Sequence, residues 1–183
     1  MHINTKHCFT TERLLIRPLA EQDKDLYISL YTDAKIMRNI GEPLSIEAAE
    51  KAFSKTLIAM EKEKPQVMTW AITTLESNEC IGLQALNWQS PEVAEIGIML
   101  LRNSNGRLLP EEAIGSIIEY GFNHLALQQI NACFAKKNLA TARVSKKTGF
   151  VFDSAKQPLD TLQRIDYVYK QSWHRHYIKT IIG

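Results

Sequence analysis

The sequence has no long apolar run and no excess of one charge. Its 183 residues contain no stretch near the roughly 20 apolar residues of a membrane-spanning helix, so we expect no membrane partner. The opening "MHINTKHCFTTER" also lacks the apolar segment of a secretion signal. Lys and Arg number 22 and Asp and Glu 20, which gives no broad basic field and argues against nucleic acid as a partner.

Cysteine is scarce as well. Cys8, Cys80 and Cys133 are odd in number and share no metal-type spacing, which excludes a disulfide framework and predicts reduced thiols in a cytoplasmic protein. His174 and His176 form a pair without a clustered third ligand, so we predict no metal site.

The apolar pattern predicts a single α+β domain over residues 1–183 with a mixed, mostly antiparallel central sheet flanked by helices. Hydrophobic residues make up 45% of the chain, and no linker or repeat interrupts it. The predicted strands are 13–19, 67–74, 79–88, 93–101, 128–135 and 165–178. The predicted helices are 21–31, 46–60, 110–125 and 139–148. Three signals mark helix ends: Ser45 as an N-cap, Pro110 in a first turn and Gly149 after a C-terminus.

The segment 100–122 joins a predicted strand to a predicted helix through a polar turn. A helix N-terminus offers unpaired backbone N–H groups and the positive end of the helix dipole, so this junction is a candidate anion site. However, the turn has one glycine, Gly106, and Leu108, Pro110 and two glutamates follow it. The sequence therefore raises the question of whether a phosphate still binds here.

Several motifs in order along nearly the whole chain resemble the GNAT N-acetyltransferases, in the branch of the ribosomal-protein-alanine and spermidine acetyltransferases. They are "TERLLIRPL", "AEIGIML", the loop and helix from Asn103, "NLATARVSKKTGF" and "DYVYKQSW". The resemblance implies a GNAT-like fold and transfer of an acetyl group from acetyl-CoA to a primary amine. It also implies that the backbone of Ile98, Met99 and Leu100 binds the pantetheine arm, together with Asn138.

In the family that this chain resembles, the pyrophosphate loop has a sequence pattern similar to Gln/Arg-x-x-Gly-x-Gly/Ala. Here it is Asn103, Ser104, Asn105, Gly106, Arg107 and Leu108. Leu108 carries a β-carbon where the family has little or none, so we expect it to crowd the phosphates or to forbid a positive φ. Pro110 lacks an N–H to donate. Two interpretations remain: a weakened or lost cofactor site, or a drifted loop that still binds through its backbone.

The resemblance also indicates the catalytic groups. Glu95 lies on the strand that splays beside the cofactor in this family, so it is the candidate general base; a structural carboxylate is the alternative. Many members have a tyrosine as the acid where this chain has Ser145, and a serine hydroxyl is a weak acid. Thr141 is therefore the stronger candidate acid near the cofactor sulfur, unless it caps its helix in place of Asn138.

A basic cluster follows the predicted strand 128–135. It consists of Lys136, Lys137, Arg143, Lys146 and Lys147. In the family fold this region lies near the 3′-phosphate of the cofactor, so Arg143 is a candidate phosphate contact; a solvated helix face is the alternative.

Two functions from different classes follow. The first is an active acetyl-CoA-dependent N-acetyltransferase whose acceptor is a protein N-terminus, a polyamine or a small amine. The second is a catalytically silent relative that binds a peptide or polyamine-like ligand in regulation, as Leu108, Pro110, Glu111 and Ser145 together suggest. Dimers through sheet edges are frequent in the family, so a homodimer is left open.

Overall fold

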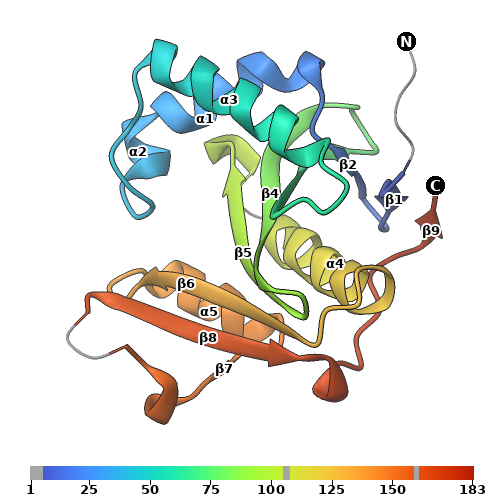
Figure 1. Cartoon of the computed structure of the whole chain (residues 1–183), viewed down its shortest axis with the longest axis vertical. Coiled ribbons are helices and arrows are strands. Elements are labelled where there is room, and N and C mark those ends of the chain that lie inside the picture. The colour runs from blue at the N-terminus through green and yellow to red at the C-terminus, as the bar shows by residue number, and fades with distance from the viewer. Residues whose placement is uncertain (1–5, 105–107, 159–160) are drawn as a thin grey trace.

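One sheet organises the chain. The computed structural model describes residues 6–104, 108–158 and 161–183. Within these residues nine strands form a sheet in the order β7-β8-β6-β5-β4-β3-β2-β1-β9 (Figure 1). The ladder between β5 and β6 is parallel and the other ladders are antiparallel, which confirms the predicted mixed, mostly antiparallel sheet.

The strands and helices have the following bounds. The strands are β1 Phe9–Thr10, β2 Leu14–Pro18, β3 Val67–Thr74, β4 Cys80–Ser90, β5 Val93–Leu100, β6 Gln129–Ala135, β7 Val151–Phe152, β8 Gln163–Tyr169 and β9 Thr180–Ile181. The helices are α1 Lys24–Thr32, α2 Ala34–Met37, α3 Ile46–Met60, α4 Leu109–His124 and α5 Leu139–Lys147. Short 3₁₀ helices span Glu21–Asp23, Arg102–Ser104, Ser154–Lys156 and Lys170–Ser172.

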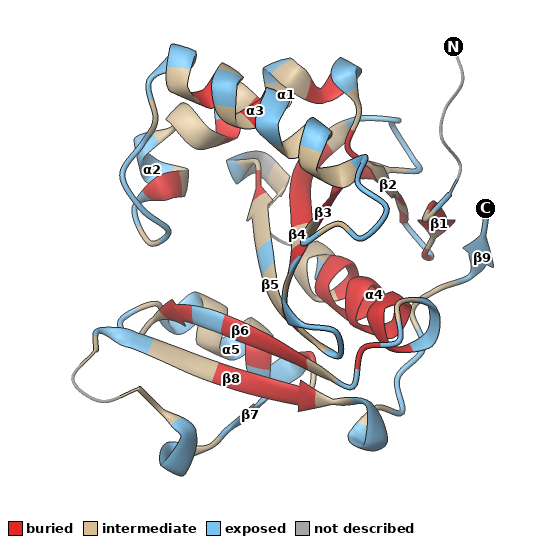
Figure 2. Cartoon of the chain, in the orientation of Figure 1, coloured by how far each residue is buried: buried red, intermediate tan, exposed pale blue. Residues whose placement is uncertain are grey.

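Helices cover both faces of the sheet. Because side chains alternate along a strand, neighbouring residues of β3 pack into two different clusters. Ala71 packs with residues of α1 and α3, whereas Trp70 packs with Ile117 and Ile118 of α4. Helix α4 is buried along most of its length (Figure 2). It therefore forms the centre of the larger core.

The predicted helix signals act at the expected places. Ser45 Oγ accepts a hydrogen bond from the backbone N–H of Ala48 at 3.2 Å, and α3 has the predicted bounds. Pro110 lies in the first turn of α4, where its missing N–H would have had no intrahelical partner. Gly149 follows α5 with a φ of +96°, a conformation that suits glycine.

The prediction of a final strand over 165–178 is wrong in its second half. Strand β8 ends at Tyr169, and the chain then crosses α4. The backbone N–H groups of Tyr177 and Ile178 donate to Glu119 Oε2 at 2.6 and 3.0 Å, so a carboxylate on α4 takes the place of a strand partner. His174 and His176 consequently lie in this crossing segment and not on a strand.

A buried carboxylate ties the N-terminal strands to the start of α4. Glu112 is 8% exposed, and its Oε1 accepts hydrogen bonds from Thr11 Oγ1 at 2.6 Å and from the backbone N–H of Arg13 at 2.9 Å. Its Oε2 accepts from Arg13 Nε at 2.6 Å. The distinctive opening "TERLLIRPL" thus includes two residues that hold the helix in place.

We expect Glu112→Gln to lower the free energy of unfolding by about 1–3 kcal/mol, because donors aimed at a buried carboxylate would lose part of their partner. Urea unfolding measures this change. Glu111→Gln is the matched control: Glu111 pairs with the exposed Lys147, so the loss should stay below about 0.5 kcal/mol. Equal losses in both variants would contradict the role given to Glu112.

Candidate active site

Strands β5 and β6 pair over three residues and then separate. Val93, Ala94 and Glu95 pair with Gln129, Ile130 and Asn131, but β5 continues to Leu100 and β6 to Ala135. Figure 1 shows the two strands running apart from this point. From Ile96 onward the edge of β5 that faces β6 has no strand partner, so its backbone groups are available to a ligand. Ile98, Met99 and Leu100 lie on this stretch.

Glu95 occupies the last paired position before the strands separate. It is half-buried, and burial raises the pKa of its carboxyl group above the ordinary value. Its Oε2 accepts a hydrogen bond from Gln89 Nε2 at 3.2 Å. Gly97 lies two residues further along β5, on the same face as Glu95. A β-carbon placed on Gly97 would meet no atom within 4 Å, so this face of β5 is open next to Glu95.

The segment after β5 leads into α4. Asn103 and Ser104 belong to the 3₁₀ helix Arg102–Ser104, and the backbone N–H of Ser104 donates to the carbonyl of Leu101 at 2.9 Å. Asn105, Gly106 and Arg107, which were predicted to bind the pyrophosphate, lie outside the described residues.

The expectation that Leu108 forbids a positive φ is wrong. Leu108 has φ +62° and ψ +19°, a left-handed conformation. Its side chain is 59% exposed, which keeps the isobutyl group out of the core. A left-handed leucine costs about 1–2 kcal/mol, and the turn into α4 is kept at that cost.

Asn138 begins α5 and leaves Thr141 free for another role. Asn138 Oδ1 accepts a hydrogen bond from the backbone N–H of Thr141 at 3.2 Å, so the asparagine is the N-cap. Within the described part of the chain, the Thr141 hydroxyl has no hydrogen-bond partner. Asn138 also lines a cavity of about 490 Å³ that reaches from Arg38, just after α2, to the start of α5.

The comparisons with known proteins agree with this geometry. The model of the acetyltransferase (GNAT) domain matches residues 13–151. The chain belongs to the GNAT acetyltransferase family. An uncharacterized N-acetyltransferase of Bacillus subtilis, YoaA, is 28% identical over 76% of this chain and 80% of that protein.

Solved structures show the same GNAT fold. Spermidine N-acetyltransferase from Vibrio cholerae, in complex with CoA and spermine, has a TM-score of 0.72 at 20% identity, over 86% of this chain and 96% of that one. RimL, a ribosomal L7/L12 α-N-protein acetyltransferase in complex with CoA, has a TM-score of 0.75 at 14% identity, over 89% and 98%. At these identities the likeness concerns the fold.

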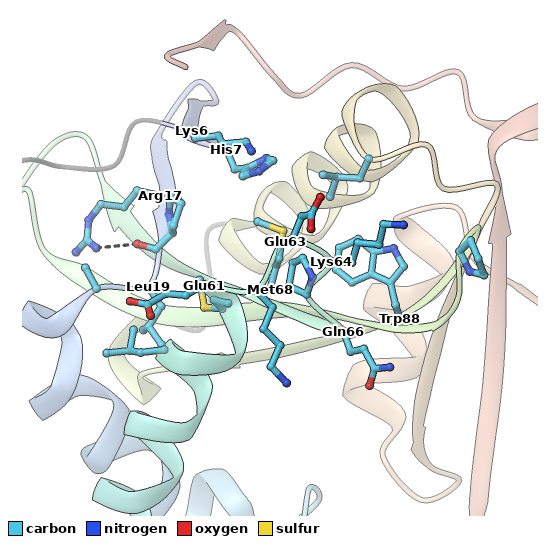
Figure 3. Close-up of a pocket in the computed structure, with 18 of the residues that line it drawn as sticks. Lys6, His7, Arg17, Leu19, Glu61, Glu63, Lys64, Gln66, Met68 and Trp88 are labelled. Atoms are coloured by element: carbon cyan, nitrogen blue, oxygen red, sulfur yellow. Dashed lines mark hydrogen bonds between the residues drawn. The ribbon is translucent and has the colours of Figure 1, made fainter.

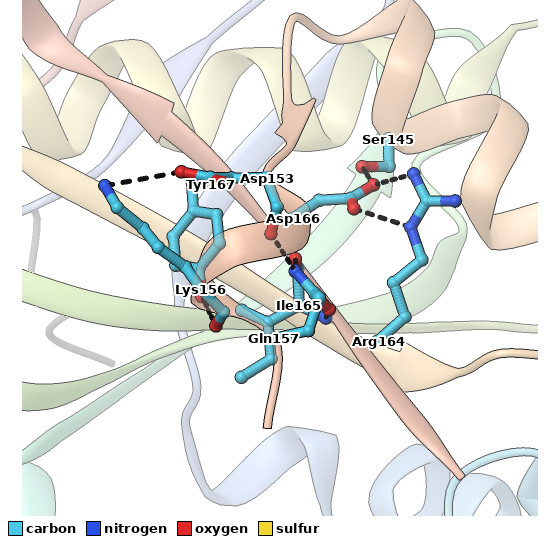
Figure 4. Close-up of polar contacts among 8 residues, drawn as sticks. All are labelled: Ser145, Asp153, Lys156, Gln157, Arg164, Ile165, Asp166 and Tyr167. Carbon is cyan, nitrogen blue, oxygen red and sulfur yellow. Dashed lines mark hydrogen bonds and ion pairs between the residues drawn. The ribbon is translucent and has the colours of Figure 1, made fainter. Parts of the chain in front are cut away.

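In this GNAT chain, Ser145 is engaged in a buried polar network. Its hydroxyl donates to Asp166 Oδ2 at 2.7 Å, and Ser145 and Asp166 are 3% and 1% exposed (Figure 4). Arg164 Nε donates to Asp166 Oδ1 at 2.7 Å. A hydroxyl committed to a buried carboxylate is a poor proton donor for a leaving thiolate. These contacts favour a structural role over the predicted acid role.

Some side chains of the basic cluster already have partners within the protein. Lys147 Nζ lies 3.3 Å from Glu111 Oε1, and Lys136 Nζ donates to the carbonyl of Thr161 at 2.7 Å. Arg143 is exposed, and no ion pair engages it in the described residues. Arg143 is therefore able to meet a phosphate, and so are Lys137 and Lys146, which are exposed and have no ion pair in the described residues either.

A second, larger cavity of about 1400 Å³ lies where the segment after α3 approaches the β4–β5 turn. Figure 3 shows Met68 and Trp88 of the sheet together with Glu63 and Lys64 of that segment. Gln89, the hydrogen-bond donor to Glu95, also lines this cavity.

Sequence reasoning missed the side chains around Glu95. Gln89, Gln129 and Asn131 contact one another or the carboxylate, yet they come from two strands 40 residues apart in the chain. No local pattern could find them, because their meeting depends on strand register. Across the ranges that the structure describes, no group of three or more His, Cys, Asp and Glu side chains could hold a metal ion. No helix in those ranges has both the length and the apolar character to cross a membrane.

We expect Ser145→Ala to lower the free energy of unfolding by about 1–3 kcal/mol while kcat changes less than threefold, because the variant removes a buried hydrogen bond to a charged group. Chemical denaturation and steady-state kinetics measure the two effects. Thr141→Val is the comparison, with a large kcat loss expected. A hundredfold loss in Ser145→Ala with an unchanged stability would instead assign the acid to Ser145.

Proposed function

We propose that this GNAT protein transfers an acetyl group from acetyl-CoA to a primary amine by direct attack of the amine on the thioester. The observation that carries the proposal is the separation of β5 and β6 directly after Glu95. It provides a strand edge for the pantetheine arm and a carboxylate at the closed end of the gap. Family membership supports the reaction type, and two solved neighbours are described as CoA complexes.

The residues present fit the co-substrate. The unpaired edge of β5 from Ile96 to Leu100 offers backbone groups to the pantetheine amides. The start of α4 offers N–H groups and the positive end of a helix dipole to the pyrophosphate. Leu108 in its left-handed conformation directs the chain into that helix. Bound acetyl-CoA would supply the activated acetyl group.

Two residues of this chain can carry out the proton transfers of the reaction. The acceptor amine must lose a proton, and Glu95 can take it directly or through a water molecule. Burial raises the pKa of Glu95, which brings the carboxylate closer to the basicity of a useful general base. Thr141, whose hydroxyl is not used in capping, is our candidate donor to the thiolate.

The alternative of a catalytically silent relative now has less support. It rested on Leu108, Pro110, Glu111 and Ser145 together, and Glu111 is paired with Lys147. Leu108 adopts the left-handed turn into α4, and Pro110 fits the first turn of the helix, although it still removes one N–H that could donate to a phosphate. Ser145 donates a hydrogen bond to Asp166, which also accepts one from Arg164. The hydroxyl of Thr141 is then our candidate proton donor.

The acceptor is a protein N-terminus, a polyamine or another small amine. The solved neighbours include a spermidine and a protein N-terminal acetyltransferase, so both classes belong in the assay panel. Mass spectrometry of acetylated products, with acetyl-CoA as donor, identifies the class. Absence of any acetyl-CoA-dependent product and of a thermal shift with acetyl-CoA would contradict the proposed function.

We expect Glu95→Gln to lower kcat about 10²–10⁴-fold while the protein still binds acetyl-CoA, because the base is lost and the binding edge of β5 is not. Since the folded-state pKa is raised, the wild-type rate should fall as pH decreases through that raised value, and this limb should vanish in the variant.

The rate over pH 5–9 and the thermal shift with acetyl-CoA measure these effects. Glu92→Gln is the matched control, because Glu92 is exposed in the β4–β5 turn. Wild-type kinetics in Glu95→Gln would remove Glu95 as the base.

A second test concerns the 3′-phosphate. We expect CoA to bind about tenfold more tightly than dephospho-CoA, and Arg143→Ala combined with Lys147→Ala to abolish this difference, because charge-assisted hydrogen bonds to phosphate are strong. Calorimetry measures both affinities. Lys55→Ala, which removes an exposed cation of α3, is the control and should preserve the ratio. Equal affinities in the wild type would show that the cluster is a solvated face.

A further inference from the structure

Three side-chain amides form a chain that ends on Glu95. Gln129 Nε2 donates to Asn131 Oδ1 at 2.7 Å, and Asn131 Nδ2 donates to Gln89 Oε1 at 2.9 Å. Gln89 Nε2 then donates to Glu95 Oε2 at 3.2 Å. The three links connect β6, the end of β4 and β5 at the position where β5 and β6 separate.

All three amides have the same orientation. Each one donates through its nitrogen toward the carboxylate, and Asn131 and Gln89 also accept on their oxygens from the preceding amide. Reversing Gln89 would place its carbonyl oxygen against an ionised Glu95 and its nitrogen against the Asn131 donor, which costs two hydrogen bonds. Asn131 is 7% exposed, so its amide is held by the protein and fixes the orientation of Gln89.

Strand register brings the chain together. Asn131 is the direct partner of Glu95 in the β5–β6 ladder. On β4 the register with β5 shifts between Trp88 and Ser90, which leaves Gln89 between two paired positions. Such irregularities re-aim side chains near functional sites. Gln89 thereby reaches both Glu95 and Asn131.

We propose that Gln89 is a positioning residue for the general base Glu95 and that Asn131 fixes the orientation in which Gln89 donates. The inference rests on the proposed function, because it assigns Gln89 a part in the same reaction. The aligned amides hold the carboxylate at the closed end of the gap. They also stabilise its ionised form, since consecutive hydrogen bonds polarise one another.

Two effects on Glu95 therefore oppose each other. Burial raises the pKa of Glu95, and a donated hydrogen bond to the carboxylate lowers it. Cys133 of β6 is an ionisable neighbour of Glu95: burial, then the charge of Glu95, raises the pKa of that thiol. Cys133 is neutral near pH 7 and does not charge in the range where Glu95 titrates. Asn87 and Gln89 on β4 carry no charge.

The test uses Gln89→Ala in the full chain, because Gln89 is exposed and the variant leaves the core intact. Carboxyl NMR should show the titration of Glu95 moved to higher pH. The acid limb of kcat/KM should move with it, so that kcat/KM falls about three- to tenfold on the acid limb and less on the plateau at higher pH. The Kd for acetyl-CoA should not change.

Asn87→Ala is the matched control. Asn87 is exposed on the same strand and faces Glu95 in the β4–β5 ladder, but it donates no hydrogen bond to the carboxylate. It should leave the Glu95 titration unchanged. In a Glu95→Gln background, Gln89→Ala should produce no further loss of activity, as expected for a residue that acts through Glu95.

The outcomes separate the inference from the function on which it rests. An unchanged Glu95 titration in Gln89→Ala, or an equal shift in Asn87→Ala, would overturn the role of Gln89. A wild-type protein without acetyltransferase activity would overturn the proposed function, while the NMR titration still reports the contact. A shifted titration with an unmoved acid limb would overturn Glu95 as the base and, with it, the catalytic part of the inference.

Discussion

The three-residue ladder between β5 and β6 is the constraint on which the site depends. β5 is fully paired to β4 on its other side, and all seven residues of β6 are paired to β8. Each of the two strands therefore keeps a complete antiparallel partner where β5 and β6 separate from each other. The separation exposes backbone groups along β5 without unfolding either half of the sheet. Glu95 and Asn131, the last pair, are held by the part of the ladder that remains.

Helix α4, which follows β5, is hydrogen-bonded to segments near both ends of the chain. Glu112 near its start accepts hydrogen bonds from Thr11 and Arg13, and Glu119 two turns later accepts them from the C-terminal segment. Buried carboxylates need such donors, and the donors here come from segments near the two ends of the chain. The same contacts fix the helix N-terminus beyond the end of β5, where the pyrophosphate is expected.

Departures from the family pattern are accommodated individually. Leu108 keeps a left-handed conformation at the entrance to α4, with its side chain in solvent. Ser145, in place of a tyrosine, donates to Asp166, which Arg164 also neutralises. These contacts commit the Ser145 side chain to the packing of α5 against β8. Thr141, three residues after the N-cap Asn138, is left with the available hydroxyl.

Local signals in the sequence determined the main elements. The apolar spacing of 46–60, the cap at Ser45, the glycine after α5 and the alternation in β3, β4 and β5 act over a few residues and gave helices and strands close to their observed bounds. The resemblance of motifs along the chain identified the family and indicated Glu95, Thr141 and Asn138. Tertiary structure alone decided the rest. The alternation after Tyr169 favoured a strand, but Glu119 draws that segment onto α4. The amide chain to Glu95 depends on the register of three strands, which residues far apart in sequence set together.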